Sequence, residues 1–142
     1  MIHSSNNKSE MLFMVNVTNA AITATFDTLD FKTLQVDVMA PTVSDTTVIL
    51  SACKLEESDI TTEASMATWS GSSVTSFAHT TIASPEVSQR FNVSLLGRKR
   101  YMMLEVTGAG AAQVMAAQAR LSRGEVFANN TTDANVIKLC DC

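Results

Sequence analysis

The feature that most constrains this chain is the recurrence of apolar side chains at every second position within short stretches. In residues 33–39, for example, Leu34, Val36 and Val38 alternate with polar side chains. Because successive side chains of a β-strand point to opposite faces, this spacing places the three aliphatic residues on one face of a sheet. Pro41 ends the stretch, since proline cannot donate a hydrogen bond to a neighbouring strand. The pattern predicts a strand with one buried face.

Stretches of the same kind follow one another along most of the chain, separated by polar loops. They cover residues 11–17, 21–26, 31–39, 46–55, 74–82, 90–96 and 101–107. We expect both faces of residues 11–17 to be buried, because that stretch is apolar at nearly every position. No helical segments alternate with the strands, as a parallel sheet would require. The sequence therefore predicts an all-β protein, either an antiparallel β-sandwich or a jelly roll.

Residues 111–122 fit two secondary structures. Their alanine-rich composition gives them high helix propensity. The same segment alternates as a strand, with Ala112, Val114 and Ala116 on one face, and a glycine-containing turn separates it from residues 101–107. We favour a strand that pairs with residues 101–107, and helix is the alternative.

The domain organisation follows from the length of the chain and the polarity of its ends. A chain of 142 residues fits one domain, because globular domains most often have ~100–150 residues. Residues 1–10 are mostly polar, and residues 124–142 are polar apart from a short apolar stretch before the terminal cysteines. We therefore expect an extended, mobile N-terminal arm over residues 1–10, a sandwich domain over 11–123 and an extended C-terminal arm over 124–142.

Composition and charge argue against several classes of partner. The net charge is −4, only 17% of the residues are charged, and 17 Thr and 15 Ser supply much of the polar surface. A negatively charged chain lacks the general attraction to phosphate on which nucleic-acid binding depends. No apolar run approaches the ~18–20 residues of a transmembrane helix, and the first residues lack the layout of an export signal. We expect a soluble protein made in the cytoplasm, with neither nucleic acid nor a membrane as its partner.

The cysteine and histidine residues do not suggest a metal site. Cys53 is central, Cys140 and Cys142 are terminal, and His3 and His79 have no ligand-like spacing to them. An odd number of cysteines is also a poor disulfide framework. We expect no metal and no cofactor, a buried reduced thiol at Cys53 and accessible thiols at the terminal pair.

Catalytic constellations are weak. A Ser–His–acid triad needs a histidine held by a carboxylate and facing a nucleophile, and we interpret His79 as a surface or edge-strand side chain. Glu56, Glu57 and Asp59 could supply a carboxylate pair for acid–base chemistry. Three acids directly after a strand are more typical of a solvated turn. We predict that the protein is not an enzyme.

One basic cluster, Arg98, Lys99 and Arg100, lies between two predicted strands. It is either a charged hairpin tip that protects a sheet edge from aggregation or a contact with an acidic patch on a partner protein. The three residues are therefore candidate partner contacts. Trp69 is the one bulky side chain that could anchor the loop at 60–73. Carbohydrate binding would need a platform of aromatic rings, and a single Trp provides little of one.

Two segments, read together, resemble a known family. Residues 53–59 read Cys-Lys-Leu-Glu-Glu-Ser-Asp, and residues 97–107 read Gly-Arg-Lys-Arg-Tyr-Met-Met-Leu-Glu-Val-Thr. This order is similar to that of small virion proteins of tailed bacteriophages, the capsid decoration (cement) proteins, and the resemblance covers roughly residues 30–122. The terminal Cys-Asp-Cys and the N-terminal arm depart from the pattern of that family.

The resemblance implies a β-sandwich that binds the outside of the phage head, stabilises the shell by bridging subunits of the major capsid protein, and often forms a homotrimer. It transfers no catalytic residue. The implied location is the capsid surface of the virion, after synthesis in the host cytoplasm. The alternatives are another virion component, such as a head–tail connector or tail protein, and a carbohydrate- or receptor-binding β-sandwich.

Overall fold

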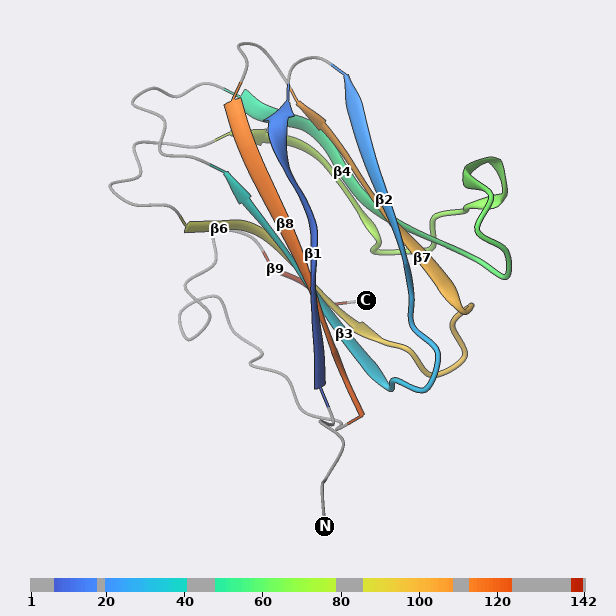
Figure 1. Cartoon of the computed structure of the whole chain (residues 1–142). Coiled ribbons are helices and arrows are strands. Elements are labelled where there is room, and N and C mark those ends of the chain that lie inside the picture. The colour runs from blue at the N-terminus through green and yellow to red at the C-terminus, as the bar shows by residue number, and fades with distance from the viewer. Residues whose placement is uncertain are drawn as a thin grey trace.

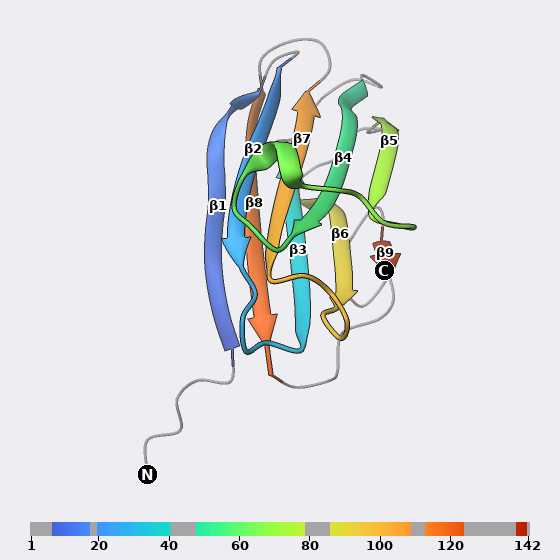
Figure 2. The same cartoon turned by 90° about the vertical axis from the view of Figure 1, so that its right-hand side faces the viewer.

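The structure is a computed structural model that describes residues 7–17, 20–40, 48–78, 86–108, 113–123 and 139–141. These residues form two β-sheets packed face to face, and their only helical element is a single 3-10 turn, η1 (Glu63–Ser65) (Figure 1). In Figure 2 the strands of both sheets run close to a common axis, as in an aligned sandwich. The predicted all-β class is confirmed.

The strands divide into a five-stranded sheet, β1-β8-β3-β6-β9, and a four-stranded sheet, β2-β7-β4-β5. Their bounds are β1 (Asn7–Val17), β2 (Ala21–Asp27), β3 (Thr33–Ala40), β4 (Val48–Ser58), β5 (Ser73–Ala78), β6 (Glu86–Ser94), β7 (Tyr101–Gly108), β8 (Gln113–Ser122) and β9 (Leu139–Asp141). Within the described residues, neighbouring strands are antiparallel except β6 and β9, which are parallel.

The order of the strands identifies the sandwich as a jelly roll. β1 pairs with β8, β2 with β7, β3 with β6 and β4 with β5, so the chain folds back on itself about the connection between β4 and β5. The folded-back pair of chain segments also curls into two sheets, so that β3 pairs with β8 and β4 pairs with β7. Eight antiparallel strands arranged in two sheets in this way form a jelly roll. The short β9 extends the five-stranded sheet beyond β6.

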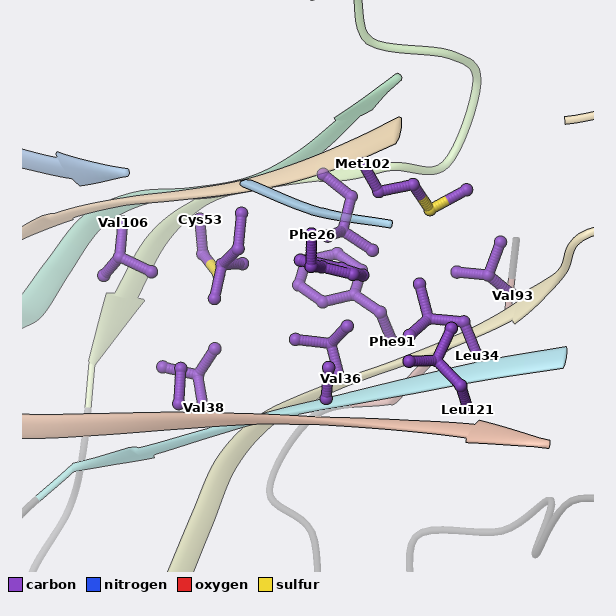
Figure 3. Close-up of a cluster of buried hydrophobic side chains, with 14 of the residues drawn as sticks. Phe26, Leu34, Val36, Val38, Cys53, Phe91, Val93, Met102, Val106 and Leu121 are labelled. Atoms are coloured by element: carbon purple, nitrogen blue, oxygen red, sulfur yellow. The ribbon is translucent and has the colours of Figure 1, made fainter. Parts of the chain in front are cut away.

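The core lies between the two sheets and follows the alternation seen in the sequence. Leu34, Val36 and Val38 of β3 are fully buried, as predicted. Phe26 of β2 and Phe91 of β6 lie between the layers at the centre of the cluster in Figure 3. Fully burying one such side chain stabilises the folded state by about 1.5–3 kcal/mol, so the facing strands hold the two sheets together.

Residues 113–122 form strand β8, so the predicted strand is confirmed and the helical alternative is wrong. The predicted pairing with residues 101–107 is also wrong, because β7 lies in the other sheet and pairs with β2 and β4. β8 lies between β1 and β3 and pairs with both. These two ladders outweigh the helix propensity of the alanines, which is worth only tenths of a kcal/mol per residue. Ala117 and Ala119 are fully buried on its core face, where small side chains leave room for the aromatic rings between the sheets.

Part of each predicted arm belongs to the five-stranded sheet. β1 begins at Asn7, which pairs with Ser122, so residues 7–10 belong to the sheet and the predicted boundary at residue 11 is wrong. At the other end, Leu139–Asp141 forms β9 and pairs with β6. The rest of the predicted arms, residues 1–6, 124–138 and 142, lies outside the described residues.

β1 is exposed where the sequence predicted burial on both faces. Leu12 and Phe13 pack against the core, and the register shifts by one residue between Met11 and Phe13. Met11 is largely exposed and Met14 is 69% exposed. β1 is the last strand of its sheet, and among the described residues no second layer covers the side chains on its outer face. Val114 of β8 is exposed on the same outer face.

A buried ion pair joins β3 and β6 on the face of the sheet opposite to the core. Asp37 and Arg90 lie directly opposite each other in the ladder. The Arg90 Nε donates to Asp37 Oδ1 at 2.5 Å and its Nη2 donates to Oδ2 at 2.8 Å. Beside them, Gln35 Nε2 donates to Asn92 Oδ1 at 3.1 Å across the same two strands. Both members of the ion pair are buried, so each charge depends on the other for compensation.

Removing one member of the Asp37–Arg90 pair should destabilise the protein strongly. Asp37→Ala or Arg90→Met leaves an uncompensated buried charge, and we expect each to lower the free energy of unfolding by about 3–5 kcal/mol. The double variant Asp37→Leu/Arg90→Met should lose much less than the sum of the two. Urea unfolding followed by circular dichroism measures all three.

The control is Lys8→Ala, which breaks the exposed Lys8–Glu10 pair and should change the free energy of unfolding by no more than about 1 kcal/mol. Single variants at Asp37 and Arg90 that are as stable as the Lys8 variant would contradict this account.

Candidate interaction surface

The basic segment forms the tight turn that connects β6 to β7. The Arg98 N–H donates to the Leu95 carbonyl at 3.1 Å, which closes a β-turn over Leu96 and Gly97. Gly97 has φ of +76°, the conformation that glycine supplies at the third position of a type II turn. A Cβ built on Gly97 would meet no atom within 4 Å, so the turn stands clear of its surroundings.

Arg100 forms an ion pair with Asp27 at the end of β2. Its Nη2 donates to Asp27 Oδ2 at 2.7 Å, and its Nε lies 3.1 Å from both carboxylate oxygens. The guanidinium also lies over the ring of Tyr101, 4.9 Å from its centroid. The hydrogen bond from Arg100 lowers the pKa of the Asp27 carboxyl below its ordinary value, and burial opposes this only in part. The pair therefore stays charged at neutral pH.

Arg98 reaches in the other direction, toward the loop between β4 and β5. Its guanidinium lies 4.6 Å from the centroid of the Trp69 ring, a cation–π contact. Its Nη1 is 3.5 Å from Glu57 Oε1, and the other oxygen of Glu57 accepts the backbone N–H of Lys99 at 3.1 Å. Glu57 therefore binds two consecutive residues of the turn.

Lys99 is the most open of the three basic side chains. Its Nζ is 3.7 Å from Asp59 Oδ2, and both side chains are largely exposed. The structure thus gives each of Arg98, Lys99 and Arg100 a carboxylate partner within the chain. Their role as contacts to an acidic partner stays a prediction, and Lys99 is the residue best placed for it.

The loop at residues 59–72 lies over the outer face of the four-stranded sheet, as both views show (Figures 1 and 2). Backbone hydrogen bonds tie it to β4, between Glu57 and Ala67 at 2.9 and 3.1 Å and between Leu55 and Ser72 at 2.8 Å. Trp69 packs against the core, as predicted for the anchor of this loop. Its Nε1 is buried without a partner among the described residues.

The acidic residues after residue 55 do not form the solvated turn that the sequence predicted. β4 continues to Ser58, and Glu56 is nearly buried on its outer face. Lys54 Nζ lies 3.2 Å from Glu56 Oε1 and 3.2 Å from Glu105 Oε2. Burial alone would lower the pKa of Lys54, but the hydrogen bonds to the two carboxylates outweigh it and raise the pKa above its ordinary value. Only Asp59 is exposed, as predicted.

The described part of the chain offers no group of three or more His, Cys, Asp or Glu side chains that could hold a metal ion. No helix there is long and apolar enough to cross a membrane. Cys53 lies in the core, as predicted. His3, His79 and Cys142 lie outside the described residues, so the predictions for them stay predictions.

Sequence reasoning missed two groups of exposed apolar side chains. One is the outer face of β1 and β8, with Met11, Met14 and Val114. The other lies at the turns, where Leu96 is 92% exposed and Leu29 is 52% exposed. The sequence signal that could have indicated the exposure of Leu96 is its position directly before Gly97, at the corner of the turn.

These features define an eight-stranded jelly roll with a rigid cluster of turns at one end. No family model matches the sequence, and no curated protein matches it. Among solved structures, the SPBc2 prophage-derived protein YomS aligns with a TM-score of 0.51 and 15% identity, over 85% of this chain and 96% of that chain. The PBSX exported protein XepA aligns with a TM-score of 0.52 and 14% identity, over 92% of this chain but only 42% of that chain. The chain shares its fold with these two proteins.

Loss of the Arg98 side chain should loosen the loop over the four-stranded sheet. Trp69 is the single tryptophan of the chain, so its fluorescence reports on this contact. We expect Arg98→Ala to shift the emission to longer wavelength and to increase quenching by acrylamide, because the ring loses its guanidinium cover. Lys99→Ala should leave both unchanged, because the ion pair of the Lys99 side chain within the described residues is the long contact to Asp59. Identical spectra for the Arg98 variant and the wild type would show that Arg98 does not hold the loop.

Proposed function

We propose that this protein is a structural component of a phage particle. The observation that carries the proposal is the jelly-roll order of its strands, an architecture that recurs in viral capsid proteins. The likeness in fold to two proteins described as prophage-derived or as a product of PBSX supports it. The charge-balanced clusters around Lys54 and Arg98 suit a binding module better than an enzyme, because their carboxylates are already paired with cations.

Within that class, the function we propose is capsid decoration: the protein binds the outside of the head and bridges subunits of the major capsid protein. The two segments that carry the resemblance to decoration proteins come together in the fold. Ser58 pairs with Tyr101, and Glu57 contacts Arg98 and Lys99. The resemblance therefore corresponds to one rigid end of the sandwich. Many identical copies on a shell would multiply a modest contact energy.

The homotrimer implied by the same resemblance needs a surface for contact between copies. The outer face of β1 and β8 is the best candidate, since Met11, Met14 and Val114 are exposed there. Residues 11–17 of the edge strand carry no charge, and an unprotected edge of this kind favours pairing with another strand. We propose a second copy of this chain as the occupant of that face.

A carbohydrate-binding role is less well supported. Sugar recognition would need an exposed aromatic platform, but one face of Trp69 lies under Arg98 and its Nε1 is buried. Tyr101 is similarly covered by Arg100. Both rings are therefore engaged within the chain.

Quantitative mass spectrometry of purified particles tests the proposal. In particles of the phage or prophage that encodes the chain, a decoration protein should be present at hundreds of copies, because it follows the repeat of the shell. A head–tail connector would be present at about a dozen copies or fewer, by the symmetry of closed rings. Such a low copy number would replace decoration by that alternative. Absence of the chain from particles that retain infectivity would overturn the virion proposal as a whole.

A further inference from the structure

Three neighbouring loops at one end of the sandwich each expose a large aliphatic side chain. Leu96 at the β6–β7 turn is 92% exposed, Ile60 after β4 is 53% exposed, and Leu29 at the β2–β3 turn is 52% exposed. Single exposed aliphatic residues are ordinary on protein surfaces. Several on adjacent loops are not, because clustered apolar surface marks interaction sites.

Leu29 and Leu96 occupy equivalent corners of two turns of the same kind. In each turn the leucine is the second residue, and a hydrogen bond closes the turn around it: Phe31 N to Thr28 O at 3.2 Å, and Arg98 N to Leu95 O at 3.1 Å. The third residue has positive φ in both, +70° at Asp30 and +76° at Gly97. This geometry directs the second residue outward at the corner of the turn.

Hydrogen bonds join the two turns to each other at both ends. The Thr28 N–H and Oγ1–H both donate to the Arg100 carbonyl, at 3.0 and 2.6 Å. At the other end, the Leu95 N–H donates to the Lys32 carbonyl at 2.8 Å. The Asp27–Arg100 ion pair adds a third link. The two leucines are therefore presented on one rigid unit.

The loop that carries Ile60 is joined to the other side of the same turn. Glu57 accepts the Lys99 N–H at 3.1 Å, and Asp59 pairs with the Lys99 ammonium group at 3.7 Å. The Ile60 N–H donates to Ser58 Oγ at 3.2 Å, which holds the start of this loop in place. The β6–β7 turn thus lies between the two other loops, with Leu96 as the central apolar side chain.

A rigid surface of this kind binds at low entropic cost. Ordering flexible side chains or a flexible loop at an interface costs conformational entropy. Here the backbone of each turn is already fixed before a partner arrives, so a contact at Leu96 loses little of its binding energy to ordering. In this interpretation, the ion pairs of basic residues 98–100 hold the turn in place.

Charge at this end favours a protein partner over an anionic membrane. Arg98, Lys99 and Arg100 are each compensated by a carboxylate of the same chain, and the chain as a whole carries −4. Attraction to anionic lipid needs uncompensated basic residues near the surface. An apolar pocket on a protein needs none.

We propose that Leu96, flanked by Leu29 and Ile60, is the anchor by which this protein docks into an apolar pocket on a protein of the virion shell. This inference rests on the proposed function and specifies which end of the molecule contacts the shell. It also assigns the basic turn a positioning role: the turn presents the leucine, and its charges are satisfied within the chain.

The test adds purified wild-type and variant protein to phage particles made without it, and measures occupancy after sedimentation. We expect Leu96→Asp to bind at least about tenfold more weakly than the wild type, because it removes the apolar anchor and places a charge against an apolar pocket. Leu96→Met, which keeps an apolar side chain on the same turn, should bind close to normally. Thr25→Asp adds the same charge at an exposed site on β2 and controls for charge alone. Circular dichroism verifies that each variant is folded.

The outcomes separate this inference from the proposed function. If the wild type occupies the particles and Leu96→Asp does so equally well, the docking inference fails and the virion proposal stands. If the wild type does not bind the particles, the decoration role itself fails, and the inference with it. Binding to vesicles of phosphatidylcholine and phosphatidylserine that is lost in Leu96→Asp would reassign the same surface to a membrane and overturn the proposal.

Discussion

Every part of this protein depends on the antiparallel pairing of the first half of the chain with the second about the connection between β4 and β5. Asn7 pairs with Ser122 and Ala21 with Thr107. The paired strands nearest the two ends of the chain are therefore separated by most of the sequence. Such contacts carry a large entropic cost of loop closure before they stabilise the fold. The buried faces of the two sheets offset that cost together, since neither sheet has a core without the other.

The same pairing produces the cluster of turns at one end. Because β2, β4 and β6 all end there and β3 and β7 begin there, three connections are brought side by side although they lie far apart in the sequence. Their polar side chains find partners in one another, as in Asp27 with Arg100 and Glu57 with Arg98. The apolar side chains Leu29, Ile60 and Leu96 find none and face solvent.

Alternation in the sequence was sufficient to predict the fold class, the core face of β3 and the burial of Cys53. It favoured the strand at 113–122 over a helix but did not identify the strands with which it pairs. It could not predict what covers each outer face, because that depends on which strand ends at a sheet edge. For this reason β1 was expected to be buried on both sides, although Met14 is exposed. The Asp37–Arg90 pair joins residues 53 positions apart, and no local pattern connects them. The sequence identified the basic turn, but its carboxylate partners come from β2, β4 and the loop after β4, and they became visible only in the folded chain.

The central claim is that this jelly roll is a shell-bound virion protein that docks by its cluster of turns. A cryo-electron microscopy map of the intact particle tests it most directly. The account predicts density for the two-sheet domain at repeated positions on the outside of the capsid, with the β6–β7 turn and Leu96 facing the shell. Density confined to the tail or connector, or a shell-bound domain whose turn end faces solvent, would contradict it.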